Sequence, residues 1–253
     1  MKPSDSSIIQ EDFRRKSDTY YERNYLANKN LNRQFRQDLV RSIIRDLNIS
    51  GKDFLDAGAG PGVLGEIVKE NRGNYFASDI SFHNIASSRK RLGNLPGVVA
   101  DTCALPFLAG SFDFVFSIGS IEYIHDFPRA LRELCRVSKP NGVIVFTIVS
   151  NHSPANWLND RIFYPFKKKK MQRKGEPIYK RYFSSLSQIT AILAKDNFEV
   201  IKHHYITPGI LDNQLKKINF LNKLERKLIK KFNFLARTNK EIVIVARLQS
   251  TGN

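Results

Sequence analysis

Apolar and polar residues follow one another in a repeating pattern that predicts alternating strands and helices. Between several short apolar runs, apolar residues recur every three or four positions, which is the period of an amphipathic helix. Alternation of this kind is typical of a mostly parallel sheet with helices on both faces. The chain is therefore predicted to be an α/β protein with seven strands, near 53–57, 75–79, 98–101, 112–117, 143–149, 196–200 and 241–247.

The region before the first strand has a helical pattern of its own. Residues 1–12 are polar, and residues 13–47 carry apolar side chains along one broad face. Gly51 is expected to separate this helical region from the first strand. We therefore divide the chain into an N-terminal helical cap (1–50) and an α/β domain (51–253).

The first strand runs into a glycine-rich turn whose composition narrows the choice of ligand. Asp56 is followed by glycines at 58, 60 and 62 and then by a helical pattern from Val63. Glycine permits positive φ angles and close approach of the backbone to a ligand, and a helix N-terminus offers free N–H groups. Val63 stands where a dinucleotide fingerprint has its third glycine, and the Gly-Lys-Ser/Thr of a P-loop is absent. The turn thus favours a different nucleotide-like ligand.

Two further acidic residues follow the next two strands. Asp79 lies 23 positions after Asp56, near the distance at which a carboxylate meets ribose hydroxyls in a Rossmann-type unit. Asp101 precedes Leu105-Pro106-Phe107, where an aspartate can accept a hydrogen bond from an adenine amine. The alternatives are a solvated strand-end aspartate and a loop aspartate without a ligand.

Taken in order, these segments resemble the class I S-adenosylmethionine-dependent methyltransferases, in particular their small-molecule methyltransferase-11-like domain. The resemblance covers the first 150 residues and includes the turn Arg136-Val137-Ser138-Lys139-Pro140 before the fifth strand. It implies a Rossmann-like fold, S-adenosylmethionine as cofactor, S-adenosylhomocysteine as product and no metal. The cofactor-binding residues that it implies are Asp56, Gly58, Ala59, Gly60, Gly62, Asp79, Ile80, Asp101, Thr102, Ser117 and Ile118.

The chain departs from the family pattern at several positions. Thr102-Cys103 precedes Ala104, and Glu122-Tyr123 stands where the family often has Glu-His. Asn141 replaces a glycine, a mild change because asparagine tolerates the left-handed region. In the family an aromatic residue of the N-terminal helix often touches the ligand, and the candidates here either do so or pack on the core: Tyr20, Tyr21 and Tyr25.

Two segments after the fifth strand are predicted to be lid-like helical insertions. The segment 151–181 places aromatic residues beside the lysine run 167–170. The segment 207–240, between strands six and seven, has an apolar stripe over 211–235 with a basic opposite face. Such segments suit an anionic membrane interface, single-stranded nucleic acid, or a helix packed on the domain with a solvated basic side.

Composition adds charge to this picture. The formal net charge is +17, which attracts anionic partners such as nucleic acid, an acidic membrane face or a phosphorylated substrate. No apolar run approaches the roughly 20 residues that a membrane-spanning helix needs. Cys103 and Cys135 lie in no metal-ligand spacing. We therefore expect a cytoplasmic protein, with peripheral contact to the inner membrane face as a further expectation.

The predicted activity is methyl transfer to a small-molecule acceptor or to a lipid- or glycan-linked one, with O-methylation favoured. A hydroxyl acceptor needs a base to remove its proton. His152 and His125 are the catalytic candidates by location, with Glu122 and Tyr123 behind them. The alternatives are an RNA methyltransferase that uses the basic surface and a non-catalytic, cofactor-binding interaction protein.

Overall fold

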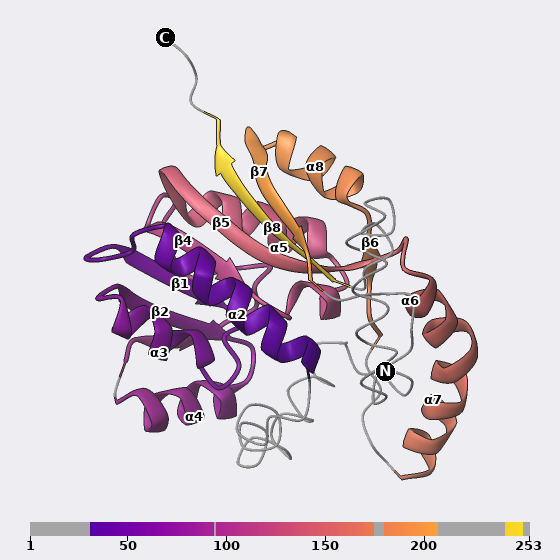
Figure 1. The fold of residues 1–253 in the computed structure, drawn as a ribbon. Helices are drawn as coiled ribbons and strands as arrows, with labels where there is room; N and C mark the ends of the chain where they lie inside the picture. The colour runs from indigo at the N-terminus through magenta and orange to yellow at the C-terminus, as the bar shows by residue number, and fades with distance from the viewer. Residues whose placement is uncertain (1–30, 94, 175–179, 207–240, 250–253) are drawn as a thin grey trace.

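The computed structural model describes residues 31–93, 95–174, 180–206 and 241–249 (Figure 1). Several expectations lie outside these residues: the three tyrosines of the N-terminal cap, most of the cap before residue 31, and the basic stripe at 211–235. The division into cap and domain therefore stays a prediction.

The described strands form one mixed sheet in the order β3-β2-β1-β4-β5-β8-β7, with β6 paired to the end of β5. Pairing is parallel except at β8, which runs antiparallel to both of its neighbours. All seven predicted strands are present, and the two-residue β6 adds to them. The bounds are β1 (Asp53–Ala57), β2 (Asn74–Asp79), β3 (Gly97–Val99), β4 (Phe112–Ser117), β5 (Ser138–Ser150), β6 (Phe183–Ser184), β7 (Phe198–Tyr205) and β8 (Glu241–Leu248).

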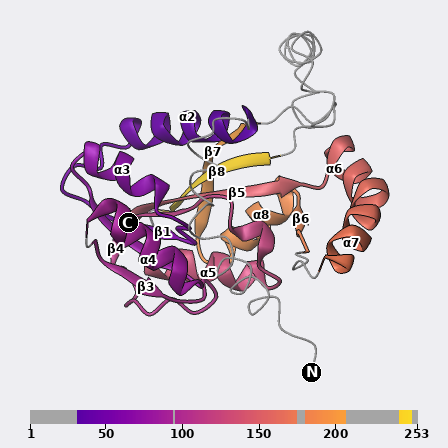
Figure 2. The same cartoon turned by 90° about the horizontal axis from the view of Figure 1, so that it is seen from below.

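Helices connect these strands and cover both faces of the sheet (Figure 2). Short helical turns follow β4 (η2, Ile121–Tyr123) and α6 (η3, Asn159–Phe163), the second being π-helical. The longer helices are α2 (Leu31–Asp46), α3 (Val63–Glu70), α4 (Phe82–Leu92), α5 (Phe127–Val137), α6 (Pro154–Leu158), α7 (Tyr164–Arg173) and α8 (Leu186–Ala194).

Alternation along the strands divides the core into two layers. Phe54 of β1 packs with the apolar side chains of α2, α3 and α4, whereas Leu55 packs with those of α5 and α8. In β5, Val145 belongs to the first layer and Ile144 to the second. Successive side chains of a strand point to opposite faces, so this period of two places helices on both sides of the sheet.

The strand order reverses direction between β1 and β4, and this places the site. β1 is flanked by β2 on one side and β4 on the other, with Asp56 beside Phe116. In open α/β sheets, ligands bind beyond the carboxyl ends of the strands at such a switch point. The loops after β1, β2, β3 and β4 meet at this edge, and they hold the residues predicted to bind the cofactor.

Local hydrogen bonds mark several ends of helices and strands. α5 begins at Phe127 because the Asp126 side chain caps it by accepting from Arg129 N at 3.2 Å. Ser185 caps α8 in a complete capping box with Gln188. β3 ends at Val99, two residues before the predicted end, and Ala100 N still donates to Asp79 O of β2 at 3.0 Å.

Candidate cofactor-binding and active site

The glycine loop joins β1 to α3 in a left-handed backbone. Gly58, Gly60 and Gly62 have φ angles of 74°, 53° and 73°. Gly58 N and Ala59 N both donate to Ser78 O, at 2.8 and 2.9 Å, which ties the loop to the end of β2. A Cβ on Gly58 would lie 2.2 Å from the Ser120 hydroxyl oxygen, whereas a Cβ on Gly60 would meet nothing within 4 Å. The loop is therefore packed on its inner side and open at Gly60.

Asp79 is held in place by three protein N–H groups. Its Oδ1 accepts from Ser81 N at 2.8 Å and from the Asn84 amide at 3.1 Å, and its Oδ2 accepts from Gly60 N at 2.8 Å. Burial raises the pKa of this carboxyl, and the hydrogen bonds from Ser81, Asn84 and Gly60 oppose that rise. A carboxylate oxygen accepts at more than one lone pair, so Oδ2 keeps capacity for another donor such as a ribose hydroxyl.

Asp56 points into the protein between β1 and β2. Its Oδ2 accepts from the Tyr75 hydroxyl at 2.8 Å, and only 2% of the residue is exposed. Its pKa is raised to about 7, mainly by burial and also by the nearby Asp79 charge, against the lowering effect of the Tyr75 hydrogen bond. The Asp56 carboxylate therefore contacts Tyr75 inside the protein, directly before the glycine loop in the chain.

The segment after β3, which the resemblance predicts to bind adenine, starts beside Asp79. The bond from Ala100 N to Asp79 O fixes its start. Asp101 is exposed and accepts from Cys103 N at 2.8 Å, while Thr102 is buried. An exposed carboxylate next to the ribose candidate can accept from an adenine amine.

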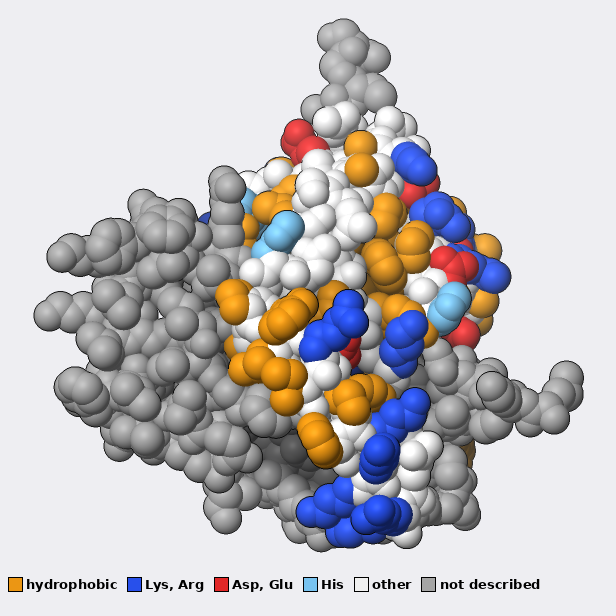
Figure 3. Space-filling model, turned by 90° about the vertical axis from the view of Figure 1, so that its right-hand side faces the viewer, with side chains coloured by type: hydrophobic (Ala, Val, Ile, Leu, Met, Phe, Trp, Pro, Cys, Tyr) orange, Lys and Arg blue, Asp and Glu red, His pale blue; other side chains and the backbone are white. Residues whose placement is uncertain are grey.

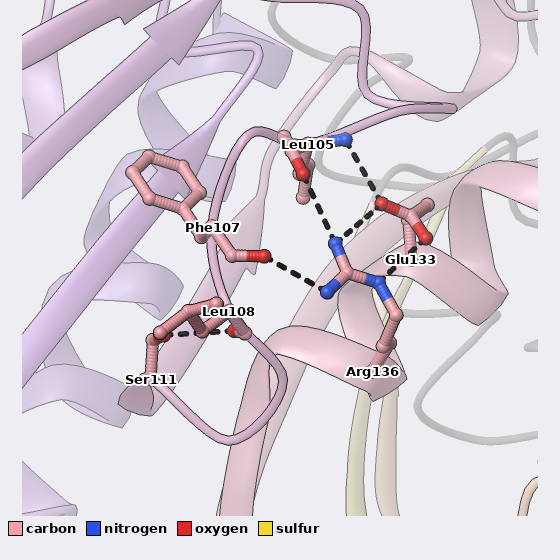
Figure 4. A network of polar contacts seen from close by, with 6 residues as sticks. All are labelled: Leu105, Phe107, Leu108, Ser111, Glu133 and Arg136. Atoms are coloured by element: carbon pink, nitrogen blue, oxygen red, sulfur yellow. Dashed lines mark hydrogen bonds and ion pairs between the residues drawn. The ribbon is translucent and has the colours of Figure 1, made fainter.

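Two residues of α5 clamp the continuation of this segment (Figure 4). The Arg136 guanidinium donates to Phe107 O at 2.8 Å and to Leu105 O at 3.0 Å. Leu105 N donates to the Glu133 carboxylate at 2.9 Å, and Glu133 is itself paired with Arg136. Sequence reasoning placed Arg136 only in a turn before β5. Its role as a loop clamp becomes visible only in the folded protein.

The loop after β4 passes along the same edge. Ser117 is fully buried at the end of β4, and Ile118 is half-buried against the layer of α2, α3 and α4. Gly119 N donates to the Thr147 hydroxyl at 2.7 Å, which ties the loop to β5. Ser120 lies against Gly58. The β4 loop is thus in direct contact with the glycine loop.

Beyond this loop lies an ionic cluster that the sequence did not reveal. Glu122 is 4% exposed, and its Oε1 lies 3.7 Å from an Arg181 guanidinium nitrogen. Arg36 of α2 pairs with Glu241 of β8 at 3.4 Å, and its guanidinium lies against Gly119. Burial raises the pKa of Glu122, and the Arg181 charge opposes that rise. Within the described residues the Oε2 of Glu122 accepts no hydrogen bond.

The two histidines predicted as catalytic are not brought together by any described contact. His125 is exposed after η2, and its ring lies edge-on to Tyr182 at a centroid distance of 5.4 Å. His152 is exposed after β5, and its backbone N donates to the Ser150 hydroxyl at 3.2 Å. Their catalytic role stays a prediction. No group of three or more potential metal ligands is assembled within the ranges that the structure describes.

The geometry fits the cofactor expected from the sequence. Open space at Gly60, the remaining capacity of Asp79 Oδ2 and the exposed carboxylate of Asp101 lie along one edge, and the resemblance predicts ribose and adenine contacts for the two aspartates. The donor chemistry is that of a nucleoside with two ribose hydroxyls and an exocyclic amine.

Comparison with known proteins agrees with this geometry. Residues 55–146 match the family described as a methyltransferase domain. A mitochondrial arginine-hydroxylase of Mus musculus is 36% identical over 109 residues, which cover 43% of this chain and 31% of that protein. A malonyl-[acyl-carrier protein] O-methyltransferase of Enterobacter lignolyticus is 28% identical over 153 residues, covering 60% of this chain and 58% of that enzyme. The chain thus spans only part of the length of these relatives.

One relative and one solved structure match over more of their length. An uncharacterised protein of Methanocaldococcus jannaschii, MJ1252, is 32% identical over 191 residues, covering 68% of this chain and 73% of that protein. The fold matches magnesium protoporphyrin IX methyltransferase from Synechocystis with a TM-score of 0.68 at 15% identity, covering 96% of this chain and 99% of that structure. The sequence motifs, the Rossmann-like sheet and these matches lead to one conclusion: the chain belongs to the class I S-adenosylmethionine-dependent methyltransferases.

Proposed function

We propose that this protein transfers the methyl group of S-adenosylmethionine to a small-molecule or lipid-linked acceptor. One observation carries the proposal: the glycine loop is closed by Ser120 at Gly58, open at Gly60, and bonded to the Asp79 carboxylate through Gly60 N. That arrangement leaves a backbone surface and a partly used carboxylate facing the same space. Both are what a ribose-bearing cofactor needs.

In this proposal the predicted residues hold the cofactor from three sides. The backbone at Gly58, Ala59 and Gly60 supports its amino-acid part, Asp79 Oδ2 accepts from a ribose hydroxyl, and Asp101 accepts from the adenine amine. Bound S-adenosylmethionine supplies an electrophilic methyl group on a sulfonium. The chain's own residues orient that group toward the region beyond β4 and β5, where the ionic cluster of Glu122 and Arg181 lies.

We further propose O-methylation, with Glu122 as the candidate base. An oxygen acceptor loses a proton in the reaction, and a buried carboxyl with a raised pKa is a better proton acceptor than an ordinary carboxylate. Its Oε2 accepts no hydrogen bond within the described residues, so it keeps the capacity to accept the acceptor's proton. The printed name of the Enterobacter relative, an O-methyltransferase, also supports this direction.

The direct test incubates the protein with methyl-labelled S-adenosylmethionine and a cell extract, then separates lipid, small-molecule, RNA and protein fractions. We expect label in the lipid or small-molecule fraction, with one S-adenosylhomocysteine formed per methyl transferred. Label in RNA would support the alternative use of the basic surface. The mouse relative is named for hydroxylation, so modification without S-adenosylhomocysteine would overturn methyl transfer. Cofactor binding with no labelled product in any fraction would favour a non-catalytic protein.

The base is tested by Glu122→Gln, which keeps the shape of the side chain. We expect turnover to fall by about 10²–10⁴-fold. In the wild-type protein the rate should rise with pH through the raised pKa of Glu122, and the variant should lose that rise. His152→Ala and His125→Ala are the matched comparisons. If either histidine variant loses turnover and Glu122→Gln does not, the base is a histidine, as the sequence predicted.

A further inference from the structure

A helical arm leaves the carboxyl edge of the sheet after β5. It consists of α6, η3 and α7, residues 154–173, and it lies at the margin of the molecule (Figures 1 and 2). Ser153 caps its start by accepting from Asn156 N at 3.3 Å, and Pro154 occupies the first helical turn. Among the described elements, α7 packs mainly on η3, the turn that precedes it. The arm therefore presents much of its own surface outward.

Three large apolar side chains of the arm are exposed. Trp157 is 61% exposed, Ile162 is 45% exposed and Phe166 is 73% exposed. The π-helical turn between Trp157 and Ile162 has a longer repeat than an α-helix, so residues five apart lie about one turn apart. Phe166 follows Ile162 by four positions, one turn of α-helix. The three side chains thus follow one another along one side of the arm.

Basic residues follow the exposed apolar side chains on the same side of the arm. Lys169, Lys170 and Arg173 follow Phe166 by three, four and seven positions, so they share its face of α7. All three are exposed, and Asp160 is the single acidic residue in the sequence of the arm. Figure 3 shows hydrophobic side chains at the centre of this face of the molecule and Lys and Arg side chains gathered at its lower end. The end of α7 lies there in Figure 1.

We propose that this arm docks the protein on an anionic lipid bilayer. Exposed Trp and Phe rings are suited to the headgroup level, and lysines extend their charged ends to anionic headgroups while their stems stay in apolar surroundings. The proposal deepens the proposed function, on which it rests for its purpose, because it brings a lipid-linked acceptor to the carboxyl edge of the sheet. No described helix is long and apolar enough to cross a membrane.

The arrangement of the arm favours a bilayer over other anionic or apolar partners. A bilayer surface has hydrocarbon and charged headgroups at different depths. The apolar residues of the arm suit the hydrocarbon boundary, and the basic residues at the end of α7 suit the headgroups. Nucleic acid is bound by rings and cations along one backbone track, and Ile162 offers no ring for a base to stack on. A second copy of the chain would bring two cationic arms together within a protein of net charge +17.

The test is co-sedimentation with phosphatidylcholine vesicles, with and without phosphatidylglycerol, at low and high salt. We expect binding only to the anionic vesicles, weakened by salt. The triple variant Lys169→Gln, Lys170→Gln, Arg173→Gln should bind roughly fivefold more weakly for each charge removed. The double variant Trp157→Ala, Phe166→Ala should bind about tenfold or more weakly.

Matched controls remove the same groups elsewhere. Lys90→Gln, Arg132→Gln, Lys195→Gln removes three exposed charges, and Leu108→Ala removes a side chain that is 83% exposed. Both should bind vesicles like the wild-type protein. If the arm variants bind as well as these controls, or if neutral vesicles bind equally well, the proposal is overturned. Salt-sensitive binding of transfer RNA that the triple variant loses, without vesicle binding, would assign the arm to nucleic acid instead.

Calorimetry with S-adenosylmethionine on the same variants separates the two proposals. We expect every arm variant to bind the cofactor like the wild-type protein, because the arm contains none of the residues assigned to cofactor binding. Vesicle binding without cofactor binding would contradict the proposed function and leave the membrane surface standing. Cofactor binding without vesicle binding would do the reverse.

Discussion

The carboxyl edge of the sheet is built differently where we propose that the cofactor binds (the cofactor side) and where we propose that the acceptor binds (the acceptor side). On the cofactor side, backbone N–H groups donate to two carboxylates, as in Gly60 N to Asp79 and Cys103 N to Asp101. The neutral side chains of Asn84 and Tyr75 add bonds to Asp79 and Asp56. On the acceptor side, charged side chains hold one another, as in Arg36 with Glu241 and Glu122 with Arg181. Every residue except proline has a backbone N–H donor, so the bonds on the cofactor side depend largely on the path of the backbone. The ion pairs on the acceptor side depend on which charged residues stand at those positions.

The largest expected effect comes from adding a side chain to the glycine loop. Gly62→Ala places a Cβ 2.2 Å from the Ser88 hydroxyl oxygen at a φ of +73°. We expect loss of cofactor binding and destabilisation by about 3 kcal/mol or more, measured by urea unfolding, because left-handed strain of about 1–2 kcal/mol adds to a steric clash. Gly51→Ala is the control, since Gly51 has a φ of +69° with nothing within 4 Å. Equal losses of stability in both variants would contradict the claim that the clash with Ser88 adds to the backbone strain.

An effect of comparable size, which appears only within a pH window, concerns the buried Asp56 carboxyl directly before the loop. The folded-state pKa of Asp56 is raised to about 7 from 3.8, so the folded protein holds a proton that the unfolded chain releases between these values. The free energy of unfolding should therefore fall as pH rises through this window, by up to about 4 kcal/mol from this group. Asp56→Asn should remove that fall, so its stability relative to wild type should increase from pH 4 to pH 8. An unchanged pH dependence would show that Asp56 is ionised at no such cost.

A smaller effect tests whether the α5 clamp serves the cofactor side. Arg136→Gln removes guanidinium bonds to two carbonyls of the 105–107 segment. We expect a stability loss of about 1–3 kcal/mol and a weaker affinity for S-adenosylmethionine. Arg132→Gln, an exposed α5 residue, is the control. Stability loss without any change in affinity would make the clamp purely structural.

The path of the chain at the proposed cofactor side could be predicted from the sequence, and the reason is physical. The polar bonds there join residues close in sequence or on adjacent parallel strands, so a strand end followed by an acid or by glycines already places them. Ser81 N and Cys103 N each reach a carboxylate two positions earlier in the chain. Bonds between residues so close in the chain can be predicted from the order of the residues.

The acceptor side could not be predicted in the same way. Arg36 and Glu241 are 205 positions apart, and Arg181 lies just before β6, far along the chain from Glu122. Nothing in a single sequence marks such partners. The sequence therefore singled out histidines near strand ends, His125 and His152, which the structure leaves exposed. It also noted the aromatic and lysine residues of the arm without indicating that they share one side.

The most direct test of the account is calorimetric titration of the full chain with S-adenosylmethionine, S-adenosylhomocysteine and NAD. The wild-type protein should bind the two sulfur ligands and not NAD. Asp101→Ala, which alters an exposed side chain, should bind them about tenfold more weakly, and Asp46→Ala, an exposed aspartate at the end of α2, should bind them unchanged. Absence of binding by the wild-type protein, or binding of NAD instead, would contradict the assignment of the glycine-loop edge and every role built on it.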